Sequence, residues 1–132
     1  MLDFDLDEAP RVLVADDAEG LVSMVMQALL EPMGCRVEAV EDPAEIIERL
    51  RRGRYAALVT ERGRSPDGLA LARSVIETPG LQHVPVLLVG SDGELDDASQ
   101  AFISGVRGML TTPIRLGEVV EALTDCMARP AA

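Results

Sequence analysis

The chain has 132 residues, the usual size of one domain, which leaves no room for two independent cores. Its 23 acidic and 12 basic residues give a formal net charge of −11 at pH 7. A negative average charge repels a phosphate backbone and an anionic bilayer, so we expect neither nucleic acid nor a membrane as a partner.

The composition is aliphatic, with only 2% aromatic residues, and no apolar run approaches the ~20 residues needed to span a bilayer. The two cysteines, Cys35 and Cys126, lack the spacing of metal ligands. No signal-peptide pattern stands at the N-terminus. We therefore expect reduced, packed cysteines in a cytoplasmic protein.

The first ten residues are acidic, end in proline and show no sustained period. We expect residues 1–10 to form an N-terminal leader, residues 11–127 to form the domain, and residues 128–132 to form a C-terminal tail.

From Arg11 onward, a short aliphatic run followed by a helical stretch occurs five times. Continuous apolar runs are typical of strands covered on both faces, and the second run alternates in polarity as an edge strand does. We expect strands at residues 12–15, 36–40, 56–59, 84–89 and 106–110.

Apolar residues at three- and four-residue spacing predict a helix after each strand. On the first helix we expect Leu21, Val25 and Leu29 to form the buried stripe, with Val22 and Met26 partly outside it. The second helix begins at Asp42-Pro43-Ala44-Glu45, which supplies an N-cap, a proline at N1 and an acid at N3. The apolar positions of the later helices are Leu69, Ala72 and Val75, then Leu95, Ala98 and Phe102, then Leu116, Val119 and Leu123.

Strict alternation of strands and helices implies right-handed crossovers between parallel strands. The sequence therefore predicts an α/β fold, a doubly wound five-stranded parallel sheet with five helices on its two faces. Sheets of this kind bind ligands beyond the carboxyl ends of their strands.

Two adjacent carboxylates, Asp16 and Asp17, follow the first strand at that edge. Each is costly to ionise beside the other unless it is solvated or holds a cation, and Mg²⁺ prefers such oxygen ligands. The alternative interpretation is that Asp17 or Ala18 starts the next helix while Asp16 is solvated.

Four segments carry a resemblance to a known family. They are RVLVADDAEG at 11–20, SPDG at 65–68, VPVLLVGS at 84–91 and GVRGMLTTPIRLGEVVEAL at 105–123. In order and spacing they resemble the receiver domain of bacterial two-component response regulators, and the similarity covers residues 11 to about 127. The resemblance implies a flavodoxin-like sheet with strand order 2-1-3-4-5 and a place in phosphorelay signalling.

In that family a histidine kinase phosphorylates an Asp at the end of the third strand, and acids after the first strand hold Mg²⁺. Of the family's site residues, the resemblance implies that this chain keeps only the acid pair, as Asp16 and Asp17. Counting back from the turn at residues 66–68 puts Thr60 at the acceptor position. At the family's other site positions, which we call the vestigial switch positions, other residue types stand. Gly90, followed by Ser91, replaces the family's Thr or Ser, and Thr112, which precedes Pro113, replaces its Lys. Met109 replaces an aromatic residue.

These departures predict a degenerate receiver, or pseudo-receiver, that is not phosphorylated. An acyl phosphate requires a carboxylate nucleophile, and the Thr60 hydroxyl is a weak nucleophile with no base beside it in sequence. The chain also has no lysine to neutralise charge on a transferred phosphoryl group.

Glu61 keeps another interpretation open. If the third strand ran one residue longer, this carboxylate would approach the acceptor position, as a nucleophile or as a fixed mimic of negative charge. Its direction argues against this, because neighbours along a strand point to opposite faces, and a solvated loop acid is the alternative.

Six of the arginines occur in two groups. Arg62 and Arg64 flank a glycine at the expected carboxyl edge, where they could bind an anion or pair with the nearby acids; two exposed loop arginines are the alternative. Residues 49–54 hold four arginines that close the second helix, where we expect them to complement the helix dipole. We expect His83, in the turn before the fourth strand, to face solvent or to bond to the backbone.

The sequence thus predicts a stand-alone receiver-like signalling module that is not an enzyme and acts through protein–protein contacts. A histidine kinase or another regulator is the expected partner, and no cofactor is required, although the acid pair could hold Mg²⁺. The family resemblance implies an interaction face, which also allows a homodimer, made by Leu95, Phe102, Met109, Ile114 and Leu116.

Two alternative functions stay open. One is an atypical receiver that is still phosphorylated, with Mg²⁺, at Glu61 or Thr60. The other is a small-anion or nucleotide sensor that uses Arg62 and Arg64.

Overall fold

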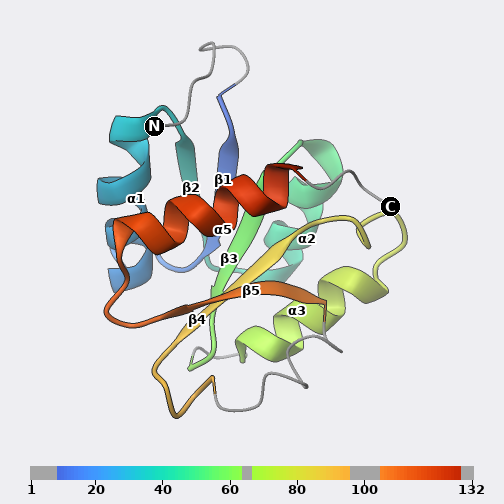
Figure 1. Cartoon of the computed structure of the whole chain (residues 1–132). Helices are drawn as coiled ribbons and strands as arrows, with labels where there is room; N and C mark the ends of the chain where they lie inside the picture. Colours follow the sequence, from blue (N-terminus) through green and yellow to red (C-terminus); the bar gives the residue numbers. More distant parts are fainter. Residues whose placement is uncertain (1–8, 64–66, 96–104, 129–132) are drawn as a thin grey trace.

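The structure is a computed structural model, and it describes residues 9–63, 67–95 and 105–128. Its sheet has five parallel strands in the order β2-β1-β3-β4-β5, as predicted (Figure 1). The strands are β1 (Arg11–Ala15), β2 (Arg36–Val40), β3 (Ala57–Glu61), β4 (Val86–Gly90) and β5 (Val106–Thr111).

The helices of the described residues are α1 (Leu21–Leu30), α2 (Pro43–Arg52), α3 (Gly68–Glu77) and α5 (Leu116–Ala128), with a short 3₁₀ turn, η2 (Glu31–Met33), after α1. The start of α2 confirms the sequence prediction, since the Asp42 side chain accepts a hydrogen bond from the Glu45 amide at 3.1 Å and Pro43 occupies N1. Most of the predicted fourth helix, with Ala98 and Phe102, lies outside the described residues.

Two apolar cores lie on opposite faces of the sheet, because successive side chains of each strand point to opposite sides. One core joins the strands to α2 and α3, through residues such as Leu13, Leu58, Ile46 and Leu71. The other joins them to α1 and α5, through residues such as Val14, Val59, Met26 and Leu123. Both cysteines are buried and neither forms a disulfide, and burial raises the pKa of the Cys35 thiol.

The predicted buried stripe of α1 is wrong. Leu21 is 78% exposed, whereas Val22, Met26 and Leu30 are buried in the core below α1 and α5. Both sets of residues have helical spacing, so periodicity alone could not choose between them. The choice follows from the rotation of α1, which points Val22, Met26 and Leu30 toward the strands.

No helix in the part of the chain that the structure describes combines the length and the apolar character needed to cross a bilayer.

Candidate functional site

The carboxyl edge of the sheet brings the predicted site segments together. The chain leaves β1 toward β2 on one side and reaches β3 on the other, so the strand order reverses between β1 and β3 (Figure 1). Open parallel sheets bind ligands at such a point. Asp16 follows β1, Glu61 ends β3, Gly90 ends β4 and Thr112 follows β5.

The acid pair after β1 accepts hydrogen bonds from backbone amides at and before the start of α1. The Asp16 carboxylate accepts hydrogen bonds from the backbone amides of Asp17 at 2.9 Å and Ser23 at 3.0 Å. Asp17 accepts one from the Glu19 amide at 2.9 Å, in the turn before α1. The Asp16 carboxylate lies so close to Gly20 that a Cβ there would collide with it. Asp16 therefore satisfies an amide of the first turn of α1, where negative charge is favourable.

Thr60 lies inside the core instead of opening to the edge. It is 0% exposed, and its register partner Leu88 belongs to the core under α2 and α3, as does Leu58 two residues before it. The Thr60 hydroxyl oxygen is buried and has no hydrogen-bond partner among the described residues. The hydroxyl is therefore not presented as an accessible nucleophile.

Glu61 ends β3, which runs past the predicted end of the strand at Val59. Alternation along β3 puts Glu61 on the face of Val59, while alternation along β1 puts Asp16 on the face of Val14. Val14 and Val59 are register partners in the core under α1 and α5, so Asp16 and Glu61 end adjacent strands on one face. Neighbouring positions on β3 do point to opposite faces, but Glu61 is the one that points to the face of Asp16. The partly exposed Glu61 carboxylate therefore lies on the same side of the sheet as the Asp16 carboxylate.

The ends of β4 and β5 offer backbone and hydroxyl groups. The Thr112 amide donates to the Gly90 carbonyl at 2.9 Å, and its hydroxyl lies 3.5 Å from the same oxygen, ahead of a cis peptide bond to Pro113. Ser91 and Glu94 cap each other: the Ser91 amide donates to the Glu94 carboxylate at 2.9 Å, and the Ser91 hydroxyl accepts from the Glu94 amide at 3.3 Å.

Of the two arginines in the loop after β3, the structure describes Arg62. The Arg62 guanidinium pairs with Asp67, which caps α3 by accepting from the Leu69 amide at 3.2 Å. Arg64 lies outside the described residues. The anion-sensing role of this loop stays a prediction.

Comparison with known proteins agrees with this arrangement. A family model described as the response regulator receiver domain matches residues 12–124. The chain belongs to this family. It is 26% identical over 118 residues to the sensory/regulatory protein RpfC of Xanthomonas campestris pv. campestris, covering 87% of this chain and 16% of RpfC. It is 25% identical over 120 residues to the chemotaxis protein CheY of Pseudomonas aeruginosa, covering 90% and 97% of the two chains.

Solved receiver structures share the fold. The receiver domain of a two-component response regulator from Bacteroides fragilis has a TM-score of 0.78 at 18% identity, covering 93% of this chain and 100% of that one. The receiver domain of the sensor histidine kinase PA1611 from Pseudomonas aeruginosa has a TM-score of 0.77 at 20% identity, covering 92% and 99%. This chain is thus a receiver domain of two-component signalling, and it spans about a sixth of the length of RpfC.

No three Asp, Glu, His or Cys side chains among the described residues gather closely enough to hold a metal ion by themselves. The Asp16 carboxylate accepts hydrogen bonds from two amides. Mg²⁺ can be held by one or two carboxylates together with water, so magnesium binding by Asp16 and Asp17 stays a prediction, and no chemical step is derived through a metal.

The predicted interaction face is divided between the two sides of the sheet. Leu95 and Met109 pack against the core under α2 and α3, whereas Ile114 packs against the other core and Leu116 is 43% exposed. Phe102 lies outside the described residues. The interaction face therefore stays a prediction.

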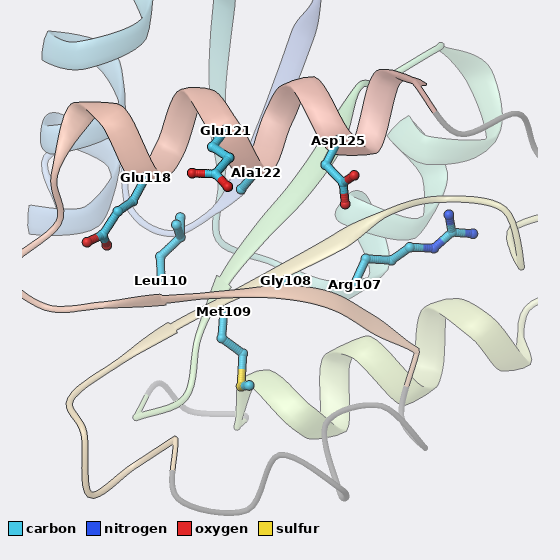
Figure 2. Close-up of a pocket in the computed structure, with 8 residues that line it drawn as sticks. All are labelled: Arg107, Gly108, Met109, Leu110, Glu118, Glu121, Ala122 and Asp125. Carbon is cyan, nitrogen blue, oxygen red and sulfur yellow. The ribbon is translucent and has the colours of Figure 1, made fainter.

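A groove of about 450 Å³ lies between β5 and α5. Figure 2 shows three acids of α5, Glu118, Glu121 and Asp125, along the side of the helix that faces β5, with Leu110 pointing toward the helix and Met109 away from it. Arg107 lies at one end of the groove. The groove wall formed by α5 is therefore acidic.

The amino edge of the sheet carries a cluster that the sequence analysis did not predict. We call Arg11, Glu38, Arg49 and Tyr55 the amino-edge cluster. Glu38 accepts from Arg11 at 3.0 Å, from Tyr55 at 2.7 Å and from Arg49 at 3.1 Å, and the Arg11 guanidinium stacks 4.5 Å from the centroid of the Tyr55 ring. These residues are far apart in sequence, so no local motif could have signalled their contact.

The cluster shifts the ionisation of its members. Partial burial raises the pKa of Glu38, but the hydrogen bonds from Tyr55 and Arg11 outweigh it and leave the pKa below its ordinary value. The hydrogen bond to Glu38 raises the pKa of Arg11. Burial, and then the bond to Glu38, raise the pKa of Tyr55. The charged forms of Glu38 and Arg11 are thereby stabilised.

Proposed function

We propose that this receiver signals through protein contacts without phosphoryl transfer at its carboxyl edge. The observation that carries the proposal is the end of β5, where Thr112 stands in the lysine position and its hydroxyl faces the Gly90 carbonyl at 3.5 Å. A hydroxyl carries no charge, so it cannot neutralise the charge that develops on a transferred phosphoryl group. The chain has no lysine anywhere to take its place.

The residues at the ends of β3 and β4 support the same proposal. The Thr60 hydroxyl is enclosed in the apolar core, and Gly90 has no side chain to donate a hydrogen bond to a phosphoryl oxygen. Glu61 then serves as a fixed negative charge beside Asp16, standing near the place where an aspartyl phosphate would form. The interaction surface is set by the sequence and by the partner instead of by phosphorylation, and the receiver has no catalytic turnover of its own.

Incubation with acetyl phosphate and Mg²⁺, followed by intact-mass measurement, tests this proposal. The expected result is an unchanged mass, under conditions in which a competent receiver gains one phosphate. A gain of one phosphate that disappears in Glu61→Gln or in Thr60→Val would overturn it.

An atypical, phosphorylated receiver is the second candidate, and one observation favours it. Strand β3 runs through Glu61, so a partly exposed carboxylate stands at the end of the strand on the same face as Asp16. Phosphate on Glu61 would form an acyl phosphate as an aspartate does. The same mass measurement separates the two candidates, and Glu61→Gln identifies the residue.

We propose the groove between β5 and α5 as the partner surface, occupied by a basic protein segment. The acids Glu118, Glu121 and Asp125 lie on one side of α5, and the chain has a net charge of −11. A second copy would set like charges against each other, which disfavours a homodimer through this groove. Sedimentation at micromolar concentration should give a monomer, and a dimer that Glu121→Arg abolishes would contradict the assignment.

A further inference from the structure

Two adjoining cavities lie at the amino edge of the sheet, at the opposite end of the strands from the site above. The first has a volume of about 310 Å³ and is lined by Arg11, Glu38, Arg49, Arg52, Gly53 and Tyr55. The second has a volume of about 360 Å³ and is lined by Leu50, Gly53, Arg54, Tyr55, His83 and Val84. Gly53 and Tyr55 line both, so one ligand could reach across them.

We propose that these cavities form a binding site for a nucleotide, with its phosphates on the arginines of the first cavity and its ring in the second. The proposal is independent of the proposed function, because it uses no residue of the carboxyl edge. It is also independent of Arg62 and Arg64.

Positive charge is in excess among the described residues that line the two cavities. The lining holds four arginines, Arg11, Arg49, Arg52 and Arg54, and the acids paired with them are the three glutamates Glu38, Glu45 and Glu48. Each of these glutamates is already paired with an arginine: Glu38 with Arg11 and Arg49, Glu45 with Arg49 at 3.2 Å, and Glu48 with Arg52 at 3.5 Å. The local excess is therefore cationic although the chain is acidic, and screening over roughly 10 Å keeps distant acids from cancelling it.

The Arg11 guanidinium is held in place before any ligand arrives. Its Nε donates to Glu38, its Nη2 donates to Tyr55 at 3.0 Å, and its plane stacks on the Tyr55 ring. Its Nη1 faces Gly53, where a Cβ would come within 2.8 Å of it. Glycine at position 53 thus keeps the approach to Nη1 open, and a guanidinium fixed in this way is suited to a phosphate oxygen.

The second cavity supplies an apolar wall for a ring. Leu50 and Val84 are buried side chains, while Arg54 and His83 are exposed at its margin. Ligand sites commonly combine an apolar cavity of this size with a few polar groups that fix orientation. The carbonyls that end α2 at Gly53 disfavour an anion, but the effect of a helix dipole is small at an exposed helix end.

A cluster of side chains that only stabilised the fold would show the same ion pairs, so the test must detect the bound ligand itself. Three probes separate the two halves of the site: ADP carries ring and phosphates, pyrophosphate carries phosphates alone, and adenosine carries the ring alone. Calorimetry and amide chemical-shift mapping with each probe, at low and at high salt, give affinity and location. We expect ADP to bind more tightly than either part, to weaken as salt rises, and to shift the amides of residues 53–55 and 83–84.

Variants at exposed side chains test the assignment without disturbing the fold. Arg52 is 67% exposed, so Arg52→Gln, and Arg52→Gln with Arg54→Gln, should fold normally and weaken ADP binding, by about tenfold for the double variant. Gly53→Ala should weaken ADP and pyrophosphate but leave adenosine less affected. Arg115→Gln, which removes one exposed charge before α5, is the matched control and should have no effect.

Several results would overturn the proposal. These are no ADP binding at millimolar concentration, equal affinity for ADP and pyrophosphate, equal weakening by Arg115→Gln, or amide shifts confined to the carboxyl edge. None of them bears on phosphorylation, so failure here and failure of the proposed function are distinguishable.

Discussion

The two edges of the sheet use their charged side chains in different ways. At the carboxyl edge, Asp16 and Asp17 are bonded to backbone amides, and the Thr60 hydroxyl is buried without a partner among the described residues. At the amino edge, Glu38 binds three side chains from distant parts of the chain. The carboxyl edge is where this fold ordinarily binds ligands. In this receiver the acids of the carboxyl edge bond to backbone amides, whereas arginine side chains gather at the amino edge.

The largest expected effect comes from placing a charge at the buried end of β3. Thr60→Asp should lower the free energy of unfolding by about 3 kcal/mol or more, because the new carboxylate would lie in an apolar core. Urea denaturation at pH 7 measures the loss. A variant of normal stability that gains phosphate from acetyl phosphate would show that position 60 opens to the edge, contrary to this structure.

Thr60→Val is the matched control for that substitution. It keeps the shape and removes a hydroxyl that is buried without a partner among the described residues, so it should raise the free energy of unfolding by about 1 kcal/mol. A loss of stability instead would mean that the hydroxyl is hydrogen-bonded in solution.

The next effect concerns the amino edge. Glu38→Ala leaves Arg11, Arg49 and Tyr55 without their common acceptor, and we expect a loss of about 2 kcal/mol in urea denaturation. Glu48→Ala removes a single exposed i,i+4 pair with Arg52 and should cost less than about 0.5 kcal/mol. Equal losses of stability for the two variants would contradict the prediction that the amino-edge cluster contributes more than a single exposed ion pair.

A smaller effect is expected at the acid pair. Asp16→Ala removes the acceptor for the Asp17 and Ser23 amides and should cost about 1 kcal/mol, the usual value of a helix cap. If the acids act as caps, millimolar Mg²⁺ should leave the melting temperature of the parent chain unchanged. A rise in melting temperature with Mg²⁺ that Asp16→Ala abolishes would restore the metal-binding role.

The smallest effect is a pH dependence at the amino edge. The pKa of Glu38 is lowered in the folded state, so the folded state holds its proton less tightly than the unfolded state does. The resulting stability is fully present above the unfolded pKa of about 4.3 and is lost as pH falls through the folded pKa. Glu38→Gln should therefore flatten the fall in stability below about pH 4.3. If Glu38→Gln left the fall in the free energy of unfolding at low pH unchanged, Glu38 would not be coupled to its partners.

The sequence by itself determined the strands, their order through the family resemblance, and the start of α2 at Asp42. These features are local, because continuous apolar runs and capping residues act over a few neighbouring positions. It also determined that lysine chemistry is absent, since that is a matter of composition.

Only the tertiary structure decided the rotation of α1, the faces on which Thr60 and Glu61 lie, and the amino-edge cluster. Val22 and Leu21 are both compatible with a helical stripe, and packing against the strands selects Val22. The faces of Thr60 and Glu61 depend on the register of β3 against β1 and β4. Arg11 and Tyr55 are 44 positions apart, and they meet because parallel strands place their amino ends side by side. Contacts of this kind depend on how elements pack, and local sequence patterns do not encode them.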